Sequence, residues 1–318
     1  MISLEDLQAA AESVHAVMPP TPQYCWPLLS ARAGCEVWVK HENHTPIGAF
    51  KLRGGIVYMQ GLRRAQPQVT GVIAATRGNH GQSVACAATR AGLSATVVVP
   101  EGNSREKNAA MQAFGGELIE QGHDFQAALE FSRELAETRG LHFVESFHDD
   151  LVRGVASYSL EFLSAQPDLE RVYVPIGLGS GICGMLAARD ALGLTTEVIG
   201  VCAEGAPAYA LSFAGGRPVS TNAAETLADG MACRVPNPEA VEVINRGVAR
   251  VVTVSEAEIK AAMRAFYTDT HNLAEGAGAA AFAALMQERD GLRGRKAGVV
   301  LSGGNIDRPL YQAILAED

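Results

Sequence analysis

The chain has 318 residues, and at roughly 150 residues per domain this length predicts about two domains. Hydrophobic residues make up 47% of the sequence and charged residues 19%, which excludes a disordered chain and predicts a large buried core. The net charge of −9 supplies no basic field for a nucleic-acid backbone or an anionic membrane, so we expect neither as a partner.

The sequence shows no cationic leader followed by an apolar run, and no apolar stretch of about 18 residues, which predicts a cytoplasmic protein. Its cysteines lie mostly in apolar surroundings and form no C-x-x-C pair, so we expect buried free thiols rather than metal ligands. They are Cys25, Cys35, Cys86, Cys183, Cys202 and Cys233.

In chain order, the first expected element is a helix to about Val17, because Ser3 and Asp6 form a capping-box pattern. From residue 71 onward, short apolar runs alternate with stretches of helix length. The expected strands are 71–75, 95–99, 117–120, 172–176, 198–203, 251–254 and 299–301, and the expected helices include 79–91, 125–138 and 181–192.

This alternation predicts an α/β fold in which parallel strands are joined by crossover helices and covered on both faces. Function is then expected at the carboxyl ends of the strands. Because the chain ends soon after its last strand and a short helix, we expect no separate C-terminal regulatory domain.

The first candidate motif is Lys40–Gly55 (KHENHTPIGAFKLRGG), in which Lys51 follows the apolar residues Ala49 and Phe50. If a helix begins here, partial desolvation lowers the pKa of the Lys51 amine from ~10.4 and frees it as a nucleophile. Taken alone, the segment fits an ordinary surface lysine equally well.

The second motif is Thr76–Gln82 (TRGNHGQ), which follows the expected strand 71–75. Small and amide-bearing residues at a strand-to-helix junction expose backbone N–H groups that suit a carboxylate. A tight turn capped by Asn79 explains the same pattern, and a lone His80 is typical of a structural histidine.

The third motif is Pro175–Gly184 (PIGLGSGICG), which follows the expected strand 172–176 and opens a helix. Its glycines let the backbone approach a phosphate, and the helix N-terminus supplies oriented N–H groups. The segment also contains G-x-G-x-x-G over 179–184, with Glu204 about 20 residues later, so a dinucleotide site stays open.

The fourth motif is Leu301–Asn305 (LSGGN), at the end of the last expected strand. The hydroxyl of Ser302 can bond a ring nitrogen of a ligand, although a serine at such a place more commonly caps a helix. Glu275, within a run of small residues expected to be helical, is either a site group or a capping acid.

Together, and in this order, the four motifs resemble the fold type II pyridoxal-phosphate enzymes, specifically the threonine/serine dehydratase and serine racemase branch. The resemblance covers nearly the whole chain, from Thr21 to Asn305. It implies a two-domain open parallel-sheet fold of the tryptophan synthase β-like kind, with a large domain of 1–54 and 149–318 and a small domain of 55–148. It also implies a homodimer and the cofactor pyridoxal 5′-phosphate.

The resemblance implies a role for each matching residue. Lys51 forms the Schiff base with the cofactor, and Phe50 packs beside its ring. Asn79 bonds the phenolic oxygen, Ser302 meets the pyridine nitrogen, and Glu275 lies near the polar edge of the ring. Gly177, Gly179, Ser180 and Gly181 belong to the phosphate loop, and Thr76, Arg77, Gly78 and His80 to the loop that accepts the substrate carboxylate.

The activity implied is that of an ammonia-lyase (dehydratase), which converts a threonine- or serine-like β-hydroxy amino acid to a 2-oxo acid and ammonia by α,β-elimination. A bulkier β-hydroxy amino acid, such as hydroxyaspartate or phenylserine, is an alternative substrate. Two other classes stay open: a nicotinamide-dependent oxidoreductase, which explains only the glycine motif, and a non-catalytic binding module that keeps the fold.

The sequence departs from this branch at three places. In the glycine motif, Leu178 and Ser180 stand where many relatives have glycine. Arg77 stands where its racemases have a proton-donating serine, so we do not expect racemase activity; Arg77 could bind a substrate carboxylate or pair with a protein acid. Glu204 and Ala208 match two of the branch's three cation ligands, but Ala210 replaces the aspartate. We therefore expect no metal, with Glu204 as a weak candidate ligand.

Overall fold

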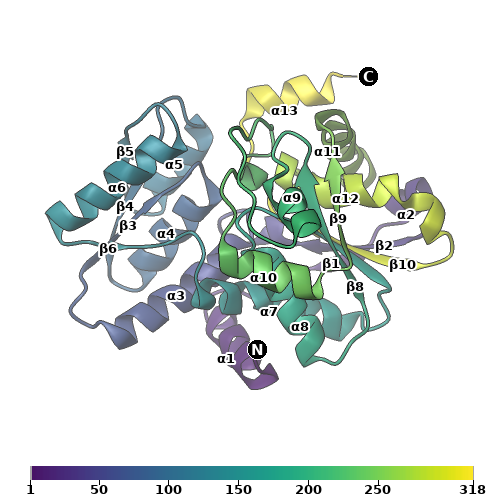
Figure 1. Ribbon diagram of the computed structural model, residues 1–318, viewed down its shortest axis with the longest axis horizontal. Coiled ribbons are helices and arrows are strands. Elements are labelled where there is room, and N and C mark those ends of the chain that lie inside the picture. Colours follow the sequence, from purple (N-terminus) through teal and green to yellow (C-terminus); the bar gives the residue numbers. More distant parts are fainter. Residues whose placement is uncertain (1, 318) are drawn as a thin grey trace.

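The computed structural model describes residues 2–317, which form two open β-sheets covered by helices (Figure 1). The larger sheet has the strand order β1–β2–β10–β7–β8–β9 and the smaller sheet the order β5–β4–β3–β6. All neighbouring strands are parallel except β1 and β2, which are antiparallel. The α/β prediction is confirmed. The antiparallel pair lies at one edge of the larger sheet, before residue 71, where no strands were expected.

The strand bounds follow the order of each sheet. The larger sheet contains β1 (Gln23–Cys25), β2 (Glu36–His41), β10 (Lys296–Leu301), β7 (Arg171–Pro175), β8 (Glu197–Ala203) and β9 (Arg250–Val254). The smaller sheet contains β5 (Gly116–Glu120), β4 (Ser94–Val99), β3 (Gly71–Ala75) and β6 (His142–Phe143).

Helices cover both faces of the larger sheet, and two apolar clusters fill the space beneath them. Alternate residues of a strand point to opposite faces, so Val299 lies in one cluster and Val300 in the other. One face carries α2 (Pro27–Ala33), α11 (Glu256–Thr270), α12 (Gly276–Gln287) and α13 (Arg308–Leu315). The other carries α1 (Leu4–His15), α7 (Asp149–Ala165), α8 (Ser180–Ala191), α9 (Ala208–Gly215) and α10 (Pro238–Gly247).

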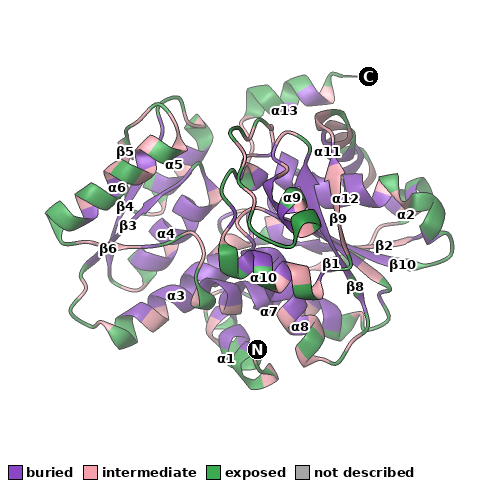
Figure 2. Cartoon of the chain, viewed as in Figure 1, coloured by how far each residue is buried: buried purple, intermediate pink, exposed green. Residues whose placement is uncertain are grey.

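The smaller sheet is packed in the same way. On one face lie α3 (Lys51–Ala65), α4 (Asn79–Arg90) and α5 (Arg105–Ala113), and on the other lies α6 (Phe125–Arg139). Single-turn 3₁₀ helices occur at Glu42–His44, Asp229–Met231 and Arg289–Leu292. Figure 2 shows that the inner strands of both sheets are mostly buried, whereas α6 and α13 carry largely exposed outer faces.

Every strand expected from residue 71 onward is present, as are the expected helices, and the capping box at Ser3 and Asp6 opens α1. The strands β1, β2 and β6 were not expected. All six cysteines are free, and four of them are buried, while Cys25 and Cys86 are half-buried. No helix within residues 2–317 is long and apolar enough to cross a bilayer.

A buried ionic cluster anchors the start of α3. The Arg53 side chain is fully buried, and its guanidinium donates to Glu42 at 2.7 Å and to Glu161 at 2.6 Å. Lys40, at the end of β2, donates to the same Glu161 at 2.6 Å. Although burial raises the pKa of Glu161, Arg53 and Lys40 hold it down to about 2. The cluster therefore ties α3 to β2 and α7 through ion pairs that share the Glu161 carboxylate, which is ionised at neutral pH.

Removing one partner from this cluster leaves a buried charge uncompensated. Glu42→Ala is expected to lower the free energy of unfolding by about 3–5 kcal/mol, measured by urea denaturation. Glu145→Ala removes the partner of Arg133 in an exposed pair and serves as the control, with an expected loss below about 1 kcal/mol. Equal losses in the two variants would contradict this account.

Candidate active site

The larger sheet brings three distant segments together. Because β10 lies between β2 and β7, the carboxyl ends of these three strands are neighbours, with Leu301 opposite His41. The segments that follow the strands lead to Lys51, to Ser302 and to the glycine loop, here defined as residues 177–181. Three of the four sequence motifs therefore meet at one edge of the sheet.

The glycine loop has room for a backbone and no room for side chains. A Cβ on Gly177 would lie 2.3 Å from the carbonyl oxygen of Gly230, and one on Gly179 would lie 2.6 Å from the Cβ of Ala240. Gly179 also has φ +103°, a conformation that glycine adopts readily. It precedes α8, whose N-terminus receives no hydrogen bond from a capping side chain, so its first N–H groups remain available to an anion.

Lys51 is the first residue of α3 and lies beside this loop. Its Nζ is 4.9 Å from the centroid of the Phe50 ring, and that ring lies 3.8 Å from the position of a Cβ on Gly181. Burial lowers the pKa of the Lys51 amine to about 8, against the opposing effect of the Glu275 carboxylate. The amine is thus far more nucleophilic near neutral pH than that of a solvated lysine.

Ser302 is buried directly after β10 and is tied to the lysine segment through the backbone. Its carbonyl accepts the N–H of Phe50 at 3.0 Å, and Ala49 forms an isolated β-bridge with Gly303. The Ser302 hydroxyl and the Lys51 amine are therefore held in the same region of the site.

Asn79, the first residue of α4, brings the smaller sheet into the site. Its amide nitrogen donates to Glu275 at 2.6 Å, and its amide oxygen accepts from Asn305 at 2.8 Å. These two bonds fix the orientation of the amide and leave one N–H free to donate to a further oxygen. Glu275 precedes α12 at the N-cap position without capping it, so of its two sequence interpretations the structure favours the site group.

Lys107 of α5 forms a second connection between the sheets. Its Nζ lies 3.0 Å from Asp229 and 3.7 Å from Glu275. Although burial lowers the pKa of Lys107, the two carboxylates hold it above its usual value. Burial in turn raises the pKa of Glu275, and Lys107 and Asn79 oppose this effect. A cleft of about 110 Å³ is lined by Lys107, Asp229 and Glu275 together with Asn305.

The loop after β3 is shaped by Thr76. Its hydroxyl oxygen accepts the N–H groups of Gly78 at 2.9 Å and Gly81 at 3.2 Å. Burial and the nearby Lys51 lower the pKa of His80 to about 3, so its imidazole is neutral at working pH. The His80 Nε2 is buried without a hydrogen-bond partner in the part of the chain that the structure describes.

Arg77 is the one exposed residue of this loop segment, 76–80. Among residues 2–317, no ion pair joins Arg77 to an acidic side chain. Of its two sequence interpretations, pairing with a protein acid therefore finds no support, and its guanidinium is left available to a ligand.

Glu204 does not join these residues. It is exposed directly after β8, while Ala208 begins α9. Within the described range, no group of three or more His, Cys, Asp and Glu side chains is arranged to hold a metal ion.

Sequence reasoning gave no role to Lys107, Asp229 or Asn305. Asn305 lies within the LSGGN motif, but Lys107 and Asp229 belong to no sequence motif and meet only in the folded chain.

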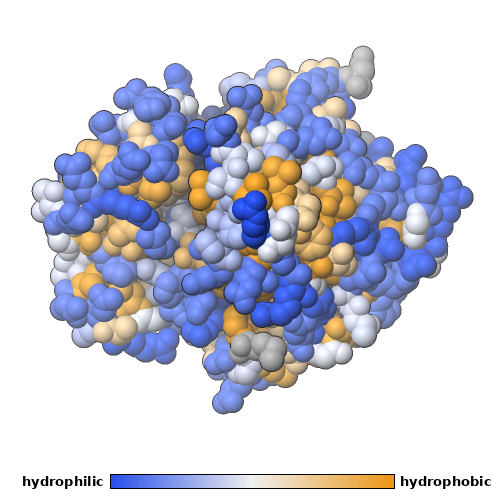
Figure 3. Space-filling view, viewed as in Figure 1, coloured by the Kyte–Doolittle hydropathy of each residue, from blue (hydrophilic) through white to orange (hydrophobic). Residues whose placement is uncertain are grey.

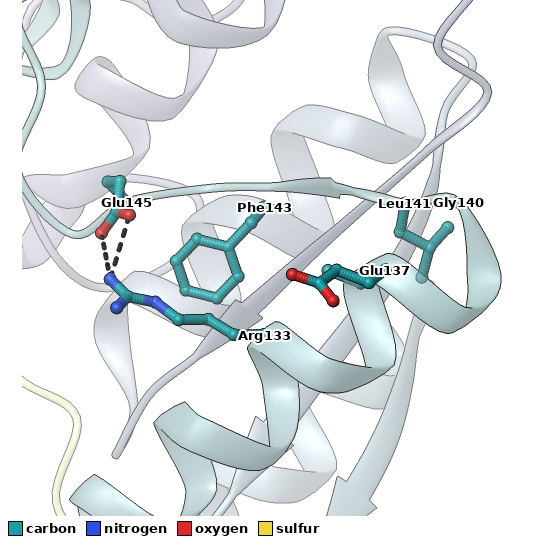
Figure 4. A pocket seen from close by; sticks show the side chains of 7 residues that line it. Arg133, Glu137, Gly140, Leu141, Phe143 and Glu145 are labelled. Carbon is teal, nitrogen blue, oxygen red and sulfur yellow. Dashed lines mark hydrogen bonds and ion pairs between the residues drawn. The ribbon is translucent and has the colours of Figure 1, made fainter.

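A separate hollow lies on the smaller sheet's side of the molecule, where Arg133 reaches across the Phe143 ring to Glu145 (Figure 4). It shares none of its lining residues with the site.

These residues fit pyridoxal phosphate. The cofactor needs an amine for its aldehyde, a cradle for its phosphate and a partner for its ring nitrogen. The low-pKa amine of Lys51, the uncapped glycine loop and the buried Ser302 supply one of each. With pyridoxal phosphate bound, the free amide N–H of Asn79 would donate to the cofactor's phenolic oxygen.

Comparisons with known proteins point to the same cofactor. Residues 16–303 match the family model described as pyridoxal-phosphate dependent enzyme. L-threonine ammonia-lyase of Thermotoga maritima is 34% identical over 316 residues, which cover 99% of this chain and 78% of that protein. The catabolic L-threonine dehydratase of Escherichia coli is 32% identical over 307 residues, which cover 96% and 92%.

Solved structures extend the similarity to the whole fold. Threonine deaminase isoform 2 from Solanum lycopersicum superimposes with a TM-score of 0.90 at 28% identity, covering 99% of this chain and 95% of that one. Maize serine racemase gives a TM-score of 0.90 at 25% identity, covering 98% and 96%.

The chain belongs to the family of pyridoxal-phosphate dependent enzymes. Within that family it is a fold type II lyase of the threonine/serine dehydratase branch, and its cofactor is pyridoxal phosphate. The nicotinamide oxidoreductase and the non-catalytic module, which the sequence had left open, are both wrong. Glu204 is therefore not the ribose-binding acid of a dinucleotide site.

The amines of Lys51 and Lys107 should titrate at well-separated pH values. In trace acetylation of the cofactor-free chain, each lysine reacts in proportion to its neutral fraction, which mass spectrometry reads residue by residue. Lys51 is expected to reach half its maximal reactivity near pH 8, because burial lowers its pKa. Lys107 should remain unreactive beyond pH ~10.4, because its carboxylate partners stabilise the cation. Coincident profiles would contradict the assigned environments.

Proposed function

We propose that this chain is an ammonia-lyase that converts a small β-hydroxy amino acid, such as threonine or serine, to a 2-oxo acid and ammonia. The observation that carries the proposal is the amine of Lys51, which lies beside the glycine loop with a pKa lowered to about 8. The named activities of the relatives, L-threonine ammonia-lyase and L-threonine dehydratase, support this choice of substrate.

When bound to the substrate's amino group, pyridoxal phosphate withdraws electrons from the α-carbon and makes the α-proton acidic. We assign the removal of that proton to Lys51, since about half of its amine is neutral near pH 8. The resulting ammonium can protonate the departing β-hydroxyl, which leaves as water. Lys51 is then neutral again.

The remaining residues would hold the reactants in place. The first N–H groups of α8 would donate to the phosphate, and those of Asn79 and His80 at the start of α4 would donate to the substrate carboxylate. Ser302 would meet the pyridine nitrogen with a neutral hydroxyl, which cannot keep that nitrogen protonated by charge pairing. Electron withdrawal from the α-carbon would then be limited, which favours loss of the β-substituent over transamination.

A dehydratase for hydroxyaspartate is the second candidate, and Arg77 favours it. Arg77 lies in the proposed carboxylate loop, and its exposed guanidinium, which has no acidic partner among residues 2–317, can bind a second substrate carboxylate in bidentate fashion. Phenylserine, the other bulky alternative, has no corresponding support among the site residues.

We further propose that the chain is a cytoplasmic homodimer in which residues 55–148 form the small domain, and residues 1–54 with 149–318 the large one. The family resemblance supports the dimer. Exposed apolar side chains offer surface for it, among them Tyr24, Leu28, Tyr267 and Leu310. Figure 3 shows a further apolar area over α9, where Leu211 is exposed.

Loss of the base should abolish the reaction. Lys51→Ala is expected to reduce formation of 2-oxo acid from threonine or serine by about 10²–10⁴-fold or more, since both the proton acceptor and the cofactor's attachment point are removed. The measurement is a coupled 2-oxo acid assay, with the surface variant Lys296→Ala as the control. Near-normal turnover in Lys51→Ala would refute the assignment.

The role of Arg77 is tested by the choice of substrate. If Arg77 binds a side-chain carboxylate, Arg77→Ser should lower kcat/KM for hydroxyaspartate by about 10–100-fold relative to threonine, because a charge-assisted hydrogen bond is lost. Phenylserine, which carries no second carboxylate, is the control substrate. An unchanged ratio would eliminate the second candidate and leave the first intact.

A further inference from the structure

We propose that Tyr209 is a positioning residue that holds the glycine loop in its anion-binding conformation. The inference rests on the proposal that this loop binds the cofactor's phosphate. Tyr209 lies in α9, outside the four motifs defined from the sequence, and is 2% exposed.

The Tyr209 hydroxyl connects two segments. It donates to the carbonyl oxygen of Leu178 at 2.8 Å and accepts the N–H of Asn237 at 3.0 Å. Asn237 is in turn the N-cap of α10, where its side chain accepts the N–H of Ala240 at 3.0 Å. One buried hydroxyl therefore joins the glycine loop to the start of α10.

The hydrogen bond to the Leu178 carbonyl fixes the direction of the N–H group of the next residue, Gly179. In a planar trans peptide, the carbonyl of Leu178 and the N–H of Gly179 point in opposite directions. Gly179 has φ +103° and no side chain, so the peptide that precedes it can rotate at little steric cost. By fixing the Leu178 carbonyl, Tyr209 fixes the direction of the Gly179 N–H beside the first turn of α8.

Packed side chains also fill the space on the side of the glycine loop that faces Tyr209. A Cβ on Gly179 would meet Ala240 at 2.6 Å, the Tyr209 hydroxyl at 3.5 Å and the Phe147 ring at 3.6 Å. Phosphate therefore has no access to Gly179 from this side. Tyr209 and α10 thus form a solid support behind the loop, and the N–H groups face an anion from the other side.

The test compares two tyrosine-to-phenylalanine variants of the full chain. Tyr209→Phe keeps the ring but leaves the Leu178 carbonyl and the Asn237 N–H without this partner. Tyr311→Phe is the matched control, because the buried Tyr311 hydroxyl has no hydrogen-bond partner in the described structure. Release of pyridoxal phosphate from each holoenzyme is measured, together with the ³¹P resonance of the bound cofactor and the binding of phosphate-free pyridoxal.

We expect Tyr209→Phe to release pyridoxal phosphate about tenfold faster than Tyr311→Phe, to shift or broaden the ³¹P resonance, and to bind pyridoxal as the control does. Equal release rates would overturn the proposal. Equal weakening of pyridoxal and pyridoxal phosphate would also overturn it, because that result indicates a general loss of structure. If instead the wild-type holoenzyme forms no 2-oxo acid while Tyr209→Phe selectively loosens the phosphate, the proposed function fails and this inference stands.

Discussion

The desolvation of the Lys51 amine is the constraint around which the site is arranged. An ammonium is costly to bury, because it loses its hydration and the low-dielectric interior disfavours the charged form. Glu275 is the carboxylate that opposes these effects, yet the pKa remains lowered to about 8. The glycine loop can attract an anion without placing a lysine or arginine next to this amine, because its positive potential comes from backbone N–H groups.

The two sheets make different contributions to this arrangement. The larger sheet sets the distances between Lys51, Ser302 and the glycine loop, because β10 lies between β2 and β7. The smaller sheet contributes Asn79 and Lys107, and both reach across to Glu275. The carboxylate is therefore stabilised only when the two halves of the chain are in contact, so the polar groups of the site also hold the sheets together.

Much of the fold could be predicted because buried parallel strands are short apolar runs, as in Gly71–Ala75. The strand β2 escaped prediction because it ends in Lys40 and His41, whose burial depends on partners far along the chain. Lys40 is satisfied by Glu161, 121 residues away, and His41 accepts a hydrogen bond from Trp26. No local pattern contains that information.

The residues of the candidate site also divide into those that the sequence predicted and those that only the structure shows. The glycine loop was predicted from its place between an expected strand and a helix and from the family resemblance. The structure adds that a Cβ on Gly177 or Gly179 would collide with neighbouring atoms. The sequence could not show that Lys107 pairs with Asp229, or that Tyr209 bonds Leu178, because these contacts span 122 and 31 residues. Such contacts arise only from tertiary packing. The pKa of Lys51 is a tertiary property as well, since an identical segment on the surface would carry an ordinary amine.

The most direct measurement is borohydride reduction of the holoenzyme, followed by peptide mass spectrometry. Reduction fixes pyridoxal phosphate to the amine that holds it. We expect the mass of the reduced cofactor on the peptide that contains Lys51. The visible absorbance of the holoenzyme should disappear on reduction. Label on Lys107 or another lysine, or no label at all, would contradict the assignment of Lys51.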